Sequence, residues 1–331
     1  MNLHIVMNSK KIILNKYLTL LQPSRKYLNV DKSKGIAPHK PVLILAIIEN
    51  ISSKLIKSNK IYLTPELVES FRKIWANLVV SEHDLRFPLP FYHLKTSGFW
   101  TLIPNKGFED FLKFSSQMRS FKNLEAAVDY AELDSIFFDL LKEKETRNVI
   151  ISFLLDTYFS ESKKKYKFSK YDVKKYINTI EKKFLKESAA KYIASLDLKN
   201  QEEVFIRSNI FKRQIPKLYN FKCCISEMSL TATFNVSLLD ACHIVPFSKS
   251  HNDHLTNGIA LCPNLHRAFD RGVITISSDY KVVVSRNIKE NLTSTYSISQ
   301  FENKSILLPK NKLHYPNIEN LNWHRNNIFK I

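Results

Sequence analysis

The sequence between residues 237 and 272 decides the fold of its part of the chain. It reads Ser237-Leu-Leu-Asp-Ala-Cys-His-Ile-Val-Pro246, passes through a polar loop, and ends as Asn257-Gly-Ile-Ala-Leu-Cys-Pro-Asn-Leu-His-Arg-Ala-Phe-Asp-Arg-Gly272. Residues 236–245 predict a strand that Pro246 ends, and residues 259–261 predict a short second strand after an Asn-Gly turn. Because proline is accepted in the first turn of a helix, Pro263 can begin a helix that carries His266. The stretch therefore predicts a β–β–α unit with a small cleft between strand and helix.

Two histidines in such a cleft suit the hydrolysis of a phosphodiester. This reaction needs a base that deprotonates water and a cation that neutralises charge on the phosphate. A neutral imidazole can serve as the base near pH 7. A second histidine with a carboxylate can hold a divalent ion, because phosphate oxygens complete the shell of the ion.

The spacing of these residues resembles the HNH, or ββα-metal, nuclease motif. Asn257 follows His243 by 14 positions, and His266 follows Asn257 by 9. The flanking sequence is similar to the variant found in many prokaryotic restriction endonucleases, and the similarity covers roughly residues 203–286. The resemblance implies that His243 is the general base, that Asn257 orients the loop and His243, and that His266 is a metal ligand.

The position before the general base departs from the family, because Cys242 stands where aspartate is common. A thiolate is a poor ligand for Mg²⁺, so Asp240 is our candidate for the second ligand, with a structural role at the strand edge as the alternative. Asp270 is a weaker candidate, and the expected cofactor is Mg²⁺ or Mn²⁺. Arg267 and Arg271 are expected to contact DNA phosphate, unless one of them pairs with Asp270.

All four cysteines lie between residues 223 and 262. Many HNH modules bind a structural zinc ion through two Cys-x-x-Cys pairs. The matching places here, Cys223 to Ser226 and Cys262 to Leu265, each retain one cysteine. We therefore expect buried free thiols rather than zinc ligands or a secreted disulfide framework.

The composition favours an anionic partner. A formal charge of +19 over 331 residues points to nucleic acid first and to an acidic membrane surface second, although an AT-rich coding bias could also enrich lysine. The longest apolar run, residues 41–48, is too short to span a bilayer. Double-stranded DNA is the expected partner, with no membrane contact and a cytoplasmic location.

Three regions of different character follow one another along the chain. Residues 1–110 predict an α+β domain with a buried helix over residues 41–51, a helix capped by Thr64, and an extended segment over residues 87–94. That segment contains two prolines, and residues 96–100 are expected to form a hairpin after it.

Residues 111–200 lack glycine and proline and predict three to five helices. Residues 201–331 contain the β–β–α unit, followed from residue 287 by a closing strand or tail without catalytic chemistry. The expected class is therefore α+β, with a DNA-reading domain, a helical region and a nuclease domain.

The N-terminal region resembles the sulfur-recognising domain of restriction enzymes directed at phosphorothioate DNA. The resemblance rests on Pro38-His-Lys-Pro-Val-Leu-Ile-Leu45 and on Phe87-Pro-Leu-Pro-Phe-Tyr-His-Leu-Lys-Thr-Ser-Gly-Phe-Trp100. It implies that Pro90 sits in an apolar cup beside His93, and that His39 and Lys40 contact the DNA backbone. The alternative is that both segments belong only to the core.

These features predict a metal-dependent restriction endonuclease that cuts double-stranded DNA. Dependence on a modification, in the manner of type IV enzymes and with phosphorothioate as one candidate, is the leading hypothesis. An ordinary site-specific restriction endonuclease and a non-catalytic DNA-binding protein with a decayed HNH module are the alternatives. One site per chain would suggest a homodimer for cutting both strands.

Overall fold

The computed structural model describes residues 3–23, 35–114, 118–166, 173–230, 238–291 and 296–331. Helices predominate and accompany small antiparallel sheets, so the predicted α+β class is confirmed. The chain divides into two compact units, the first formed by residues 1–178 and 199–206, the second by residues 179–198 and 207–331. Within the region 111–200, residues 179–198 fall in the second unit and the others in the first.

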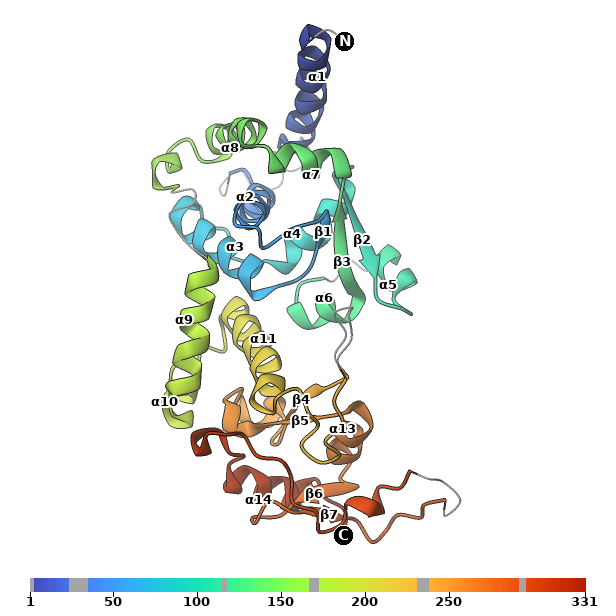
Figure 1. Cartoon of the computed structure of the whole chain (residues 1–331). Coiled ribbons are helices and arrows are strands. Elements are labelled where there is room, and N and C mark those ends of the chain that lie inside the picture. The colour runs from blue at the N-terminus through green and yellow to red at the C-terminus, as the bar shows by residue number, and fades with distance from the viewer. Residues whose placement is uncertain (1–2, 24–34, 115–117, 167–172, 231–237, 292–295) are drawn as a thin grey trace. The chain divides into compact units, whose positions relative to one another are not determined.

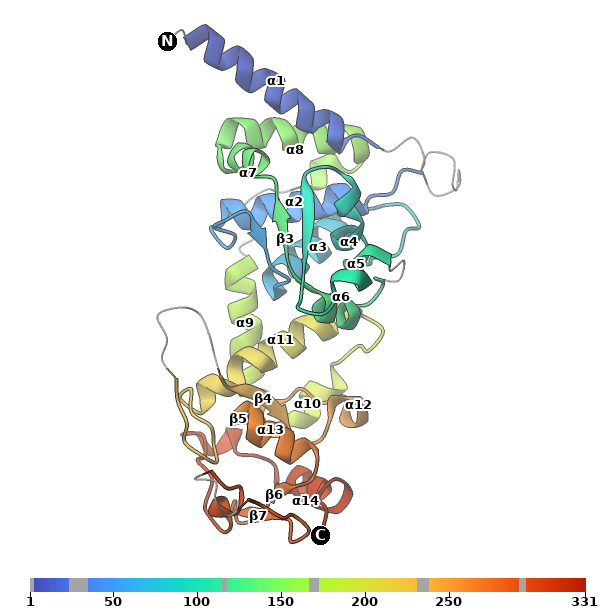
Figure 2. The same ribbon diagram turned by 90° about the vertical axis from the view of Figure 1, so that its right-hand side faces the viewer.

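A buried helix, α2, lies at the centre of the first unit. It lies between the pair α7 and α8 and the pair α3 and α4 (Figure 1, Figure 2). The helices of this unit are α1 (Leu3–Leu21), α2 (His39–Ser52), α3 (Pro65–Leu78), α4 (Pro88–His93), α5 (Glu109–Phe114), α6 (Phe121–Ala127), α7 (Ser135–Lys142) and α8 (Lys144–Tyr158). Burial of α2 on nearly all sides explains its apolar sequence.

The first unit also contains a three-stranded antiparallel sheet. Its strands are β1 (Lys60–Ile61), β2 (Trp100–Pro104) and β3 (Val128–Leu133), with β3 in the middle. Strand β3 lies in the region where only helices were predicted, so that expectation was wrong. No glycine or proline separates it from α6 and α7, and therefore the composition gave no sign of a boundary.

The start of α3 is the one that the sequence predicted. Oγ1 of Thr64 accepts a hydrogen bond from the backbone N–H of Leu67 at 3.3 Å, and Pro65 occupies the first helical position. Capping by threonine satisfies one of the N–H groups that have no acceptor within the helix.

The segment 87–94 was predicted to be extended, and this prediction was wrong. Residues Pro88–His93 form α4, followed by a 3-10 helix, Leu94–Thr96. Both prolines lie in the first turn of α4, where a backbone N–H would have no acceptor within the helix, so neither interrupts it. The expected hairpin at 96–100 is also absent, because β2 begins at Trp100 and pairs with β3.

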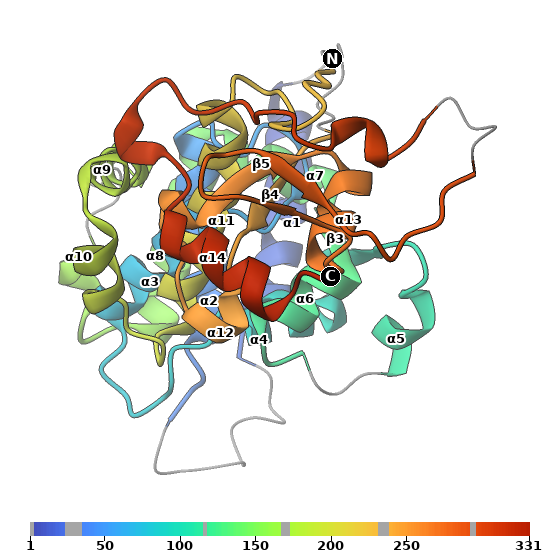
Figure 3. The ribbon, with the colours of Figure 1, turned by 90° about the horizontal axis from the view of Figure 1, so that it is seen from below.

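The second unit is built around the predicted β–β–α unit. Strand β4 (Asp240–His243) pairs antiparallel with β5 (Gly258–Leu261), and α13 (Pro263–Asp270) follows (Figure 3). Its other elements are α10 (Ala189–Ala194), α12 (Phe247–Ser250), β6 (Ile274–Ile276), β7 (Val282–Val284) and α14 (Ile318–Asn327), and both α9 (Val173–Lys186) and α11 (Gln201–Leu218) have residues in each unit. The predicted strand was longer, 236–245, but positions 236 and 237 lie outside the described residues.

The C-terminal region contains a helix where a strand or tail was expected. Helix α14 packs against β6, and His324 reaches back to α13. Its Nδ1 lies 2.9 Å from Oγ1 of Thr275, and its Nε2 lies 3.0 Å from the carbonyl oxygen of Phe269. Few of the residues in this helix are apolar, so its sequence lacks the usual helical pattern.

Among the described residues, no helix combines the length and the apolar character that crossing a bilayer requires.

Candidate active site

The β–β–α unit brings the two predicted histidines to one cavity. His243 ends β4 opposite Gly258 of β5, while His266 lies in the middle of α13. A cavity of about 300 Å³ is lined by His243, Phe247, His266, Asp270 and His324. The two histidines lie close together because α13 begins at Pro263, directly after the hairpin ends at Cys262.

The imidazole of His243 is held from two sides. Its Nε2 lies 2.7 Å from Oδ1 of Asp253, a carboxylate whose side chain is 2% exposed. The ring of Phe211 stacks on the imidazole with centroids 4.1 Å apart. A carboxylate at Nε2 favours the tautomer with its proton on that nitrogen, and Nδ1 then has a lone pair for a proton of water.

Asn257 fixes the loop that follows β4. Its Oδ1 accepts from the backbone N–H of Val245 at 2.9 Å, and its Nδ2 donates to the carbonyl oxygens of Val245 and Asn252 at 2.9 and 2.8 Å. The side chain is completely buried. Asn257 therefore joins the end of the strand to the polar loop.

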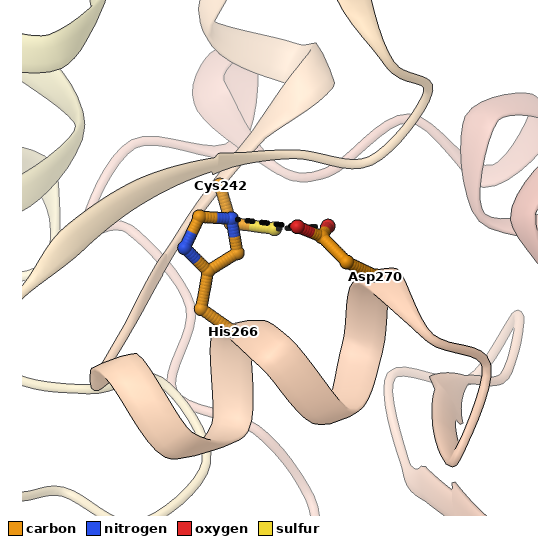
Figure 4. Close-up of side chains that lie close together, drawn as sticks. All are labelled: Cys242, His266 and Asp270. Atoms are coloured by element: carbon orange, nitrogen blue, oxygen red, sulfur yellow. Dashed lines mark hydrogen bonds and ion pairs between the residues drawn. The ribbon is translucent and has the colours of Figure 1, made fainter. Parts of the chain in front are cut away.

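His266 lies between two carboxylates. Its Nδ1 is 3.0 Å from Oδ2 of Asp240, and its Nε2 is 3.4 Å from Oδ2 of Asp270, one helical turn further along α13. Figure 4 shows His266 and Asp270 on α13 with the sulfur of Cys242 beside them. One donor atom from each of these three residues lies within 4.8 Å of the other two.

Asp240, the carboxylate expected to bind metal, is not one of those three residues. Its Oδ2 lies against Nδ1 of His266, the ring nitrogen other than the one near Asp270. Asp270 is the carboxylate that lies near both Nε2 of His266 and the sulfur of Cys242. Burial and the neighbouring charges of Asp270 and Asp240 raise the pKa of the Cys242 thiol.

Arg267 and Arg271 are exposed, the first on α13 and the second directly after it. Within the described part of the chain, neither forms an ion pair with Asp270 or another acidic side chain. Both guanidinium groups are therefore accessible to a phosphate backbone.

The four cysteines are buried free thiols. The thiol of Cys262 donates a hydrogen bond to the sulfur of Cys223, and this bond lowers the pKa of Cys223. Ser226 lies next to the pair, with its Oγ 4.0 Å from the Cys262 sulfur. These three residues stand at positions where many HNH modules bind zinc, with serine in one of the cysteine positions.

Two residues of the site were missed by the sequence analysis. Asp253 lies in the loop between His243 and Asn257, where no regular spacing distinguishes it from other polar residues. Phe211 lies in α11, 32 positions before His243 along the chain. A fixed distance in sequence cannot indicate such a contact, because it depends on how α11 packs against the hairpin.

The predicted DNA-contacting residues of the first unit line one cavity. His39, Lys40, Pro90 and His93 all border a hollow of about 620 Å³, which Leu89 also lines. Nζ of Lys40 donates to the carbonyl oxygen of Leu20 at 2.6 Å. The ring of His39 packs on Trp75 with centroids 4.6 Å apart, and burial lowers the pKa of His39 to about 4. Burial also lowers the pKa of Lys40.

Comparison with known families identifies the β–β–α unit. Residues 223–277 match the HNH endonuclease family (HNH_2). The chain therefore carries an HNH endonuclease domain, and the prediction of such a domain from the spacing of His243, Asn257 and His266 is confirmed.

One solved structure similar to this chain is described as a modification dependent TagI restriction endonuclease. The similarity has a TM-score of 0.26 and 21% sequence identity, and it covers 37% of this chain and 38% of that chain. A search of curated proteins gave no match.

Proposed function

We propose that this protein is a metal-dependent restriction endonuclease that hydrolyses double-stranded DNA and acts on modified DNA. The observation that carries the proposal is one cavity lined by His243 together with His266 and Asp270. A base and an acidic metal site that face the same small volume can act on the same phosphodiester.

Each residue of the site has a separate task in this proposal. Nδ1 of His243 takes the proton of the attacking water, while Asp253 holds the imidazole in place. Asn257 keeps the loop attached to the strand that carries His243. His266 and Asp270 would hold a divalent cation, since imidazole and carboxylate groups are both common ligands of divalent metal ions in proteins. When bound, the cation stabilises negative charge on the phosphate and the leaving oxygen.

The cavity of the first unit supports a role in reading modified DNA. Leu89, Pro90 and Leu94 give it an apolar side, and His39, Lys40 and His93 border it as well. A sulfur atom in place of a phosphate oxygen is poorly hydrated and would favour apolar contacts, and the ammonium group of Lys40 would attract the remaining oxygens. Phosphorothioate DNA is therefore our candidate substrate.

A plasmid nicking assay tests the nuclease proposal. We expect His243→Ala to lose metal-dependent cleavage and to keep its affinity for DNA, because the base does not hold the substrate. Cleavage at the wild-type rate by this variant would refute the assigned base. If the wild-type protein binds DNA but does not cleave it with any divalent ion, the protein would instead be a DNA-binding protein with a decayed HNH module.

A second assay tests substrate choice. The same plasmid is prepared with and without phosphorothioate or methyl modification, and only the modified form should be cut. Equal cutting of both forms would indicate an ordinary site-specific endonuclease. Sedimentation of the protein with DNA would show whether two copies assemble to cut both strands.

A further inference from the structure

The donor atoms beside the active-site cavity belong to three different chemical classes. They are a sulfur of Cys242, an imidazole nitrogen of His266 and a carboxylate oxygen of Asp270, all within 4.8 Å of one another. Metal bonds of about 2.0–2.3 Å place the ligands of one ion roughly 3–4 Å apart. A small adjustment therefore lets all three atoms bind a single ion.

Asp240 determines which nitrogen of His266 faces this group. Because Oδ2 of Asp240 lies 3.0 Å from Nδ1, that nitrogen carries the proton and Nε2 is left for an ion. Asp270 lies on the Nε2 side at 3.4 Å. Asp240 is thus a positioning residue, while Asp270 supplies the carboxylate ligand.

The sulfur of Cys242 has only weak contacts in the described structure. It donates toward the carbonyl oxygen of His243 at 3.5 Å and toward Oδ1 of Asp270 at 4.0 Å, and a thiol is only a weak hydrogen-bond donor. The side chain is completely buried yet lies beside two ligands that border the cavity. A metal ion held by His266 and Asp270 would give this sulfur a strong interaction as a third ligand.

We propose that Cys242, His266 and Asp270 form a three-ligand site that selects a borderline transition-metal ion, such as Co²⁺ or Zn²⁺, over Mg²⁺. This inference rests on the proposed metal-dependent nuclease. Mg²⁺ prefers six oxygen ligands, whereas two of these three donors are sulfur and nitrogen. Thiolate and imidazole ligands suit zinc and related ions, and three protein ligands with a fourth open position are typical of catalytic zinc sites.

Cobalt spectroscopy tests the site without relying on cleavage. The full chain is treated with a chelator and titrated with Co²⁺, and a thiolate-to-cobalt charge-transfer band in the near ultraviolet should appear. Zn²⁺ should abolish the band at equal concentration, while a large excess of Mg²⁺ should leave it unchanged. We expect Cys242→Ser to lose the band and to bind Co²⁺ at least about 10-fold more weakly.

The thiol pair Cys223 and Cys262 supplies the matched controls. Cys223→Ser and Cys262→Ser should each keep the band, since neither residue belongs to the proposed site. Cys242→Asp, a second variant at the same position, should lose the band and gain affinity for Mg²⁺. Circular dichroism confirms that each variant is folded.

Two results would overturn the inference. One is a band that survives Cys242→Ser but disappears in Cys223→Ser or Cys262→Ser, because the thiol pair would then be the site. The other is displacement of Co²⁺ by an equal concentration of Mg²⁺. A band that behaves as expected in a protein without nicking activity would refute the nuclease proposal and leave the metal site standing.

Discussion

The ring of Phe211 lies parallel to the imidazole of His243, with centroids 4.1 Å apart and an angle of 8° between the planes. Together with the bond from Nε2 to Asp253, this contact restricts rotation of the imidazole about its own side-chain bonds. Catalytic side chains lose efficiency when their orientation varies, and such packing preorganises them. The position of His243 thus depends on a helix that precedes the nuclease motif.

Replacing Asp253 should slow cleavage without weakening binding. In Asp253→Asn the amide can donate to the imidazole, which favours the wrong tautomer, so we expect kcat to fall by about 10–100-fold with KM unchanged. Single-turnover nicking measures the effect. The exposed Asp279→Asn in the same unit serves as control and should cut normally. Equal loss in both variants would contradict the positioning role.

Adding a methyl group at Gly258 should disturb the support of His243. A Cβ atom there would lie 2.6 Å from the ring of Phe211 and 2.4 Å from Ile215. We expect Gly258→Ala to lower the free energy of unfolding by about 1–3 kcal/mol and to reduce cleavage. Denaturant unfolding measures the loss.

The double variant Gly258→Ala with Phe211→Leu tests the cause of that loss. The smaller leucine side chain relieves one of the two contacts, so the double variant should be less unstable than the sum of the two single changes. Strict additivity would mean that the methyl group does not act through Phe211.

Asn257 should matter for stability as well as for activity. Asn257→Asp keeps an acceptor for the Val245 N–H but places a carboxylate oxygen against the carbonyl oxygens of Val245 and Asn252. Because two buried hydrogen bonds are lost, we expect unfolding to become easier by about 2–4 kcal/mol. Thermal unfolding measures this change, and a loss of less than about 0.5 kcal/mol in the free energy of unfolding would mean that the hydrogen bonds of Asn257 do not stabilise the fold.

Acid should weaken the contact between α14 and α13. Burial lowers the pKa of His324 from 6.5 to about 4, so the unfolded chain takes up this proton at a higher pH than the folded chain does. The contribution of the neutral side chain, on the order of 3 kcal/mol, is fully present above pH 6.5 and is lost as the pH falls toward 4.

Calorimetry between pH 4 and pH 6.5 measures this dependence. His324→Gln should flatten the slope of stability against pH and leave the share that comes from the half-buried His39, whose pKa is also lowered to about 4. An unchanged slope in this variant would mean that His324 is protonated as easily in the folded protein as in the unfolded one.

The nuclease motif could be predicted from the sequence because its spacing reflects a short, local fold. His243, Asn257 and His266 lie in a hairpin and the helix directly after it, so their separation along the chain determines their separation in space. The positions of α2 and α3 were predictable for the same reason, since proline and a capping threonine act on their own first turns.

Contacts between distant segments could not be predicted in this way. Phe211 reaches His243 through packing, and β3 exists because β1 and β2 pair with it from both sides. The helix at 88–93 was missed because two prolines were judged by their usual effect inside a helix, whereas both occupy its first turn.

The boundary between the two compact units falls inside α11, between Ile206 and Arg207. The ring of Phe205 stacks on Phe121 at 4.4 Å, and the carboxylate of Glu202 accepts the backbone N–H of Phe87. A nuclease fragment cut at residue 201 would carry these side chains away from their partners. The nuclease fragment would then expose apolar surface around Phe205, and the N-terminal fragment would lose the contacts of Phe121 and Phe87. We therefore expect the proposed DNA-reading and nuclease functions to be lost when the two fragments are expressed separately.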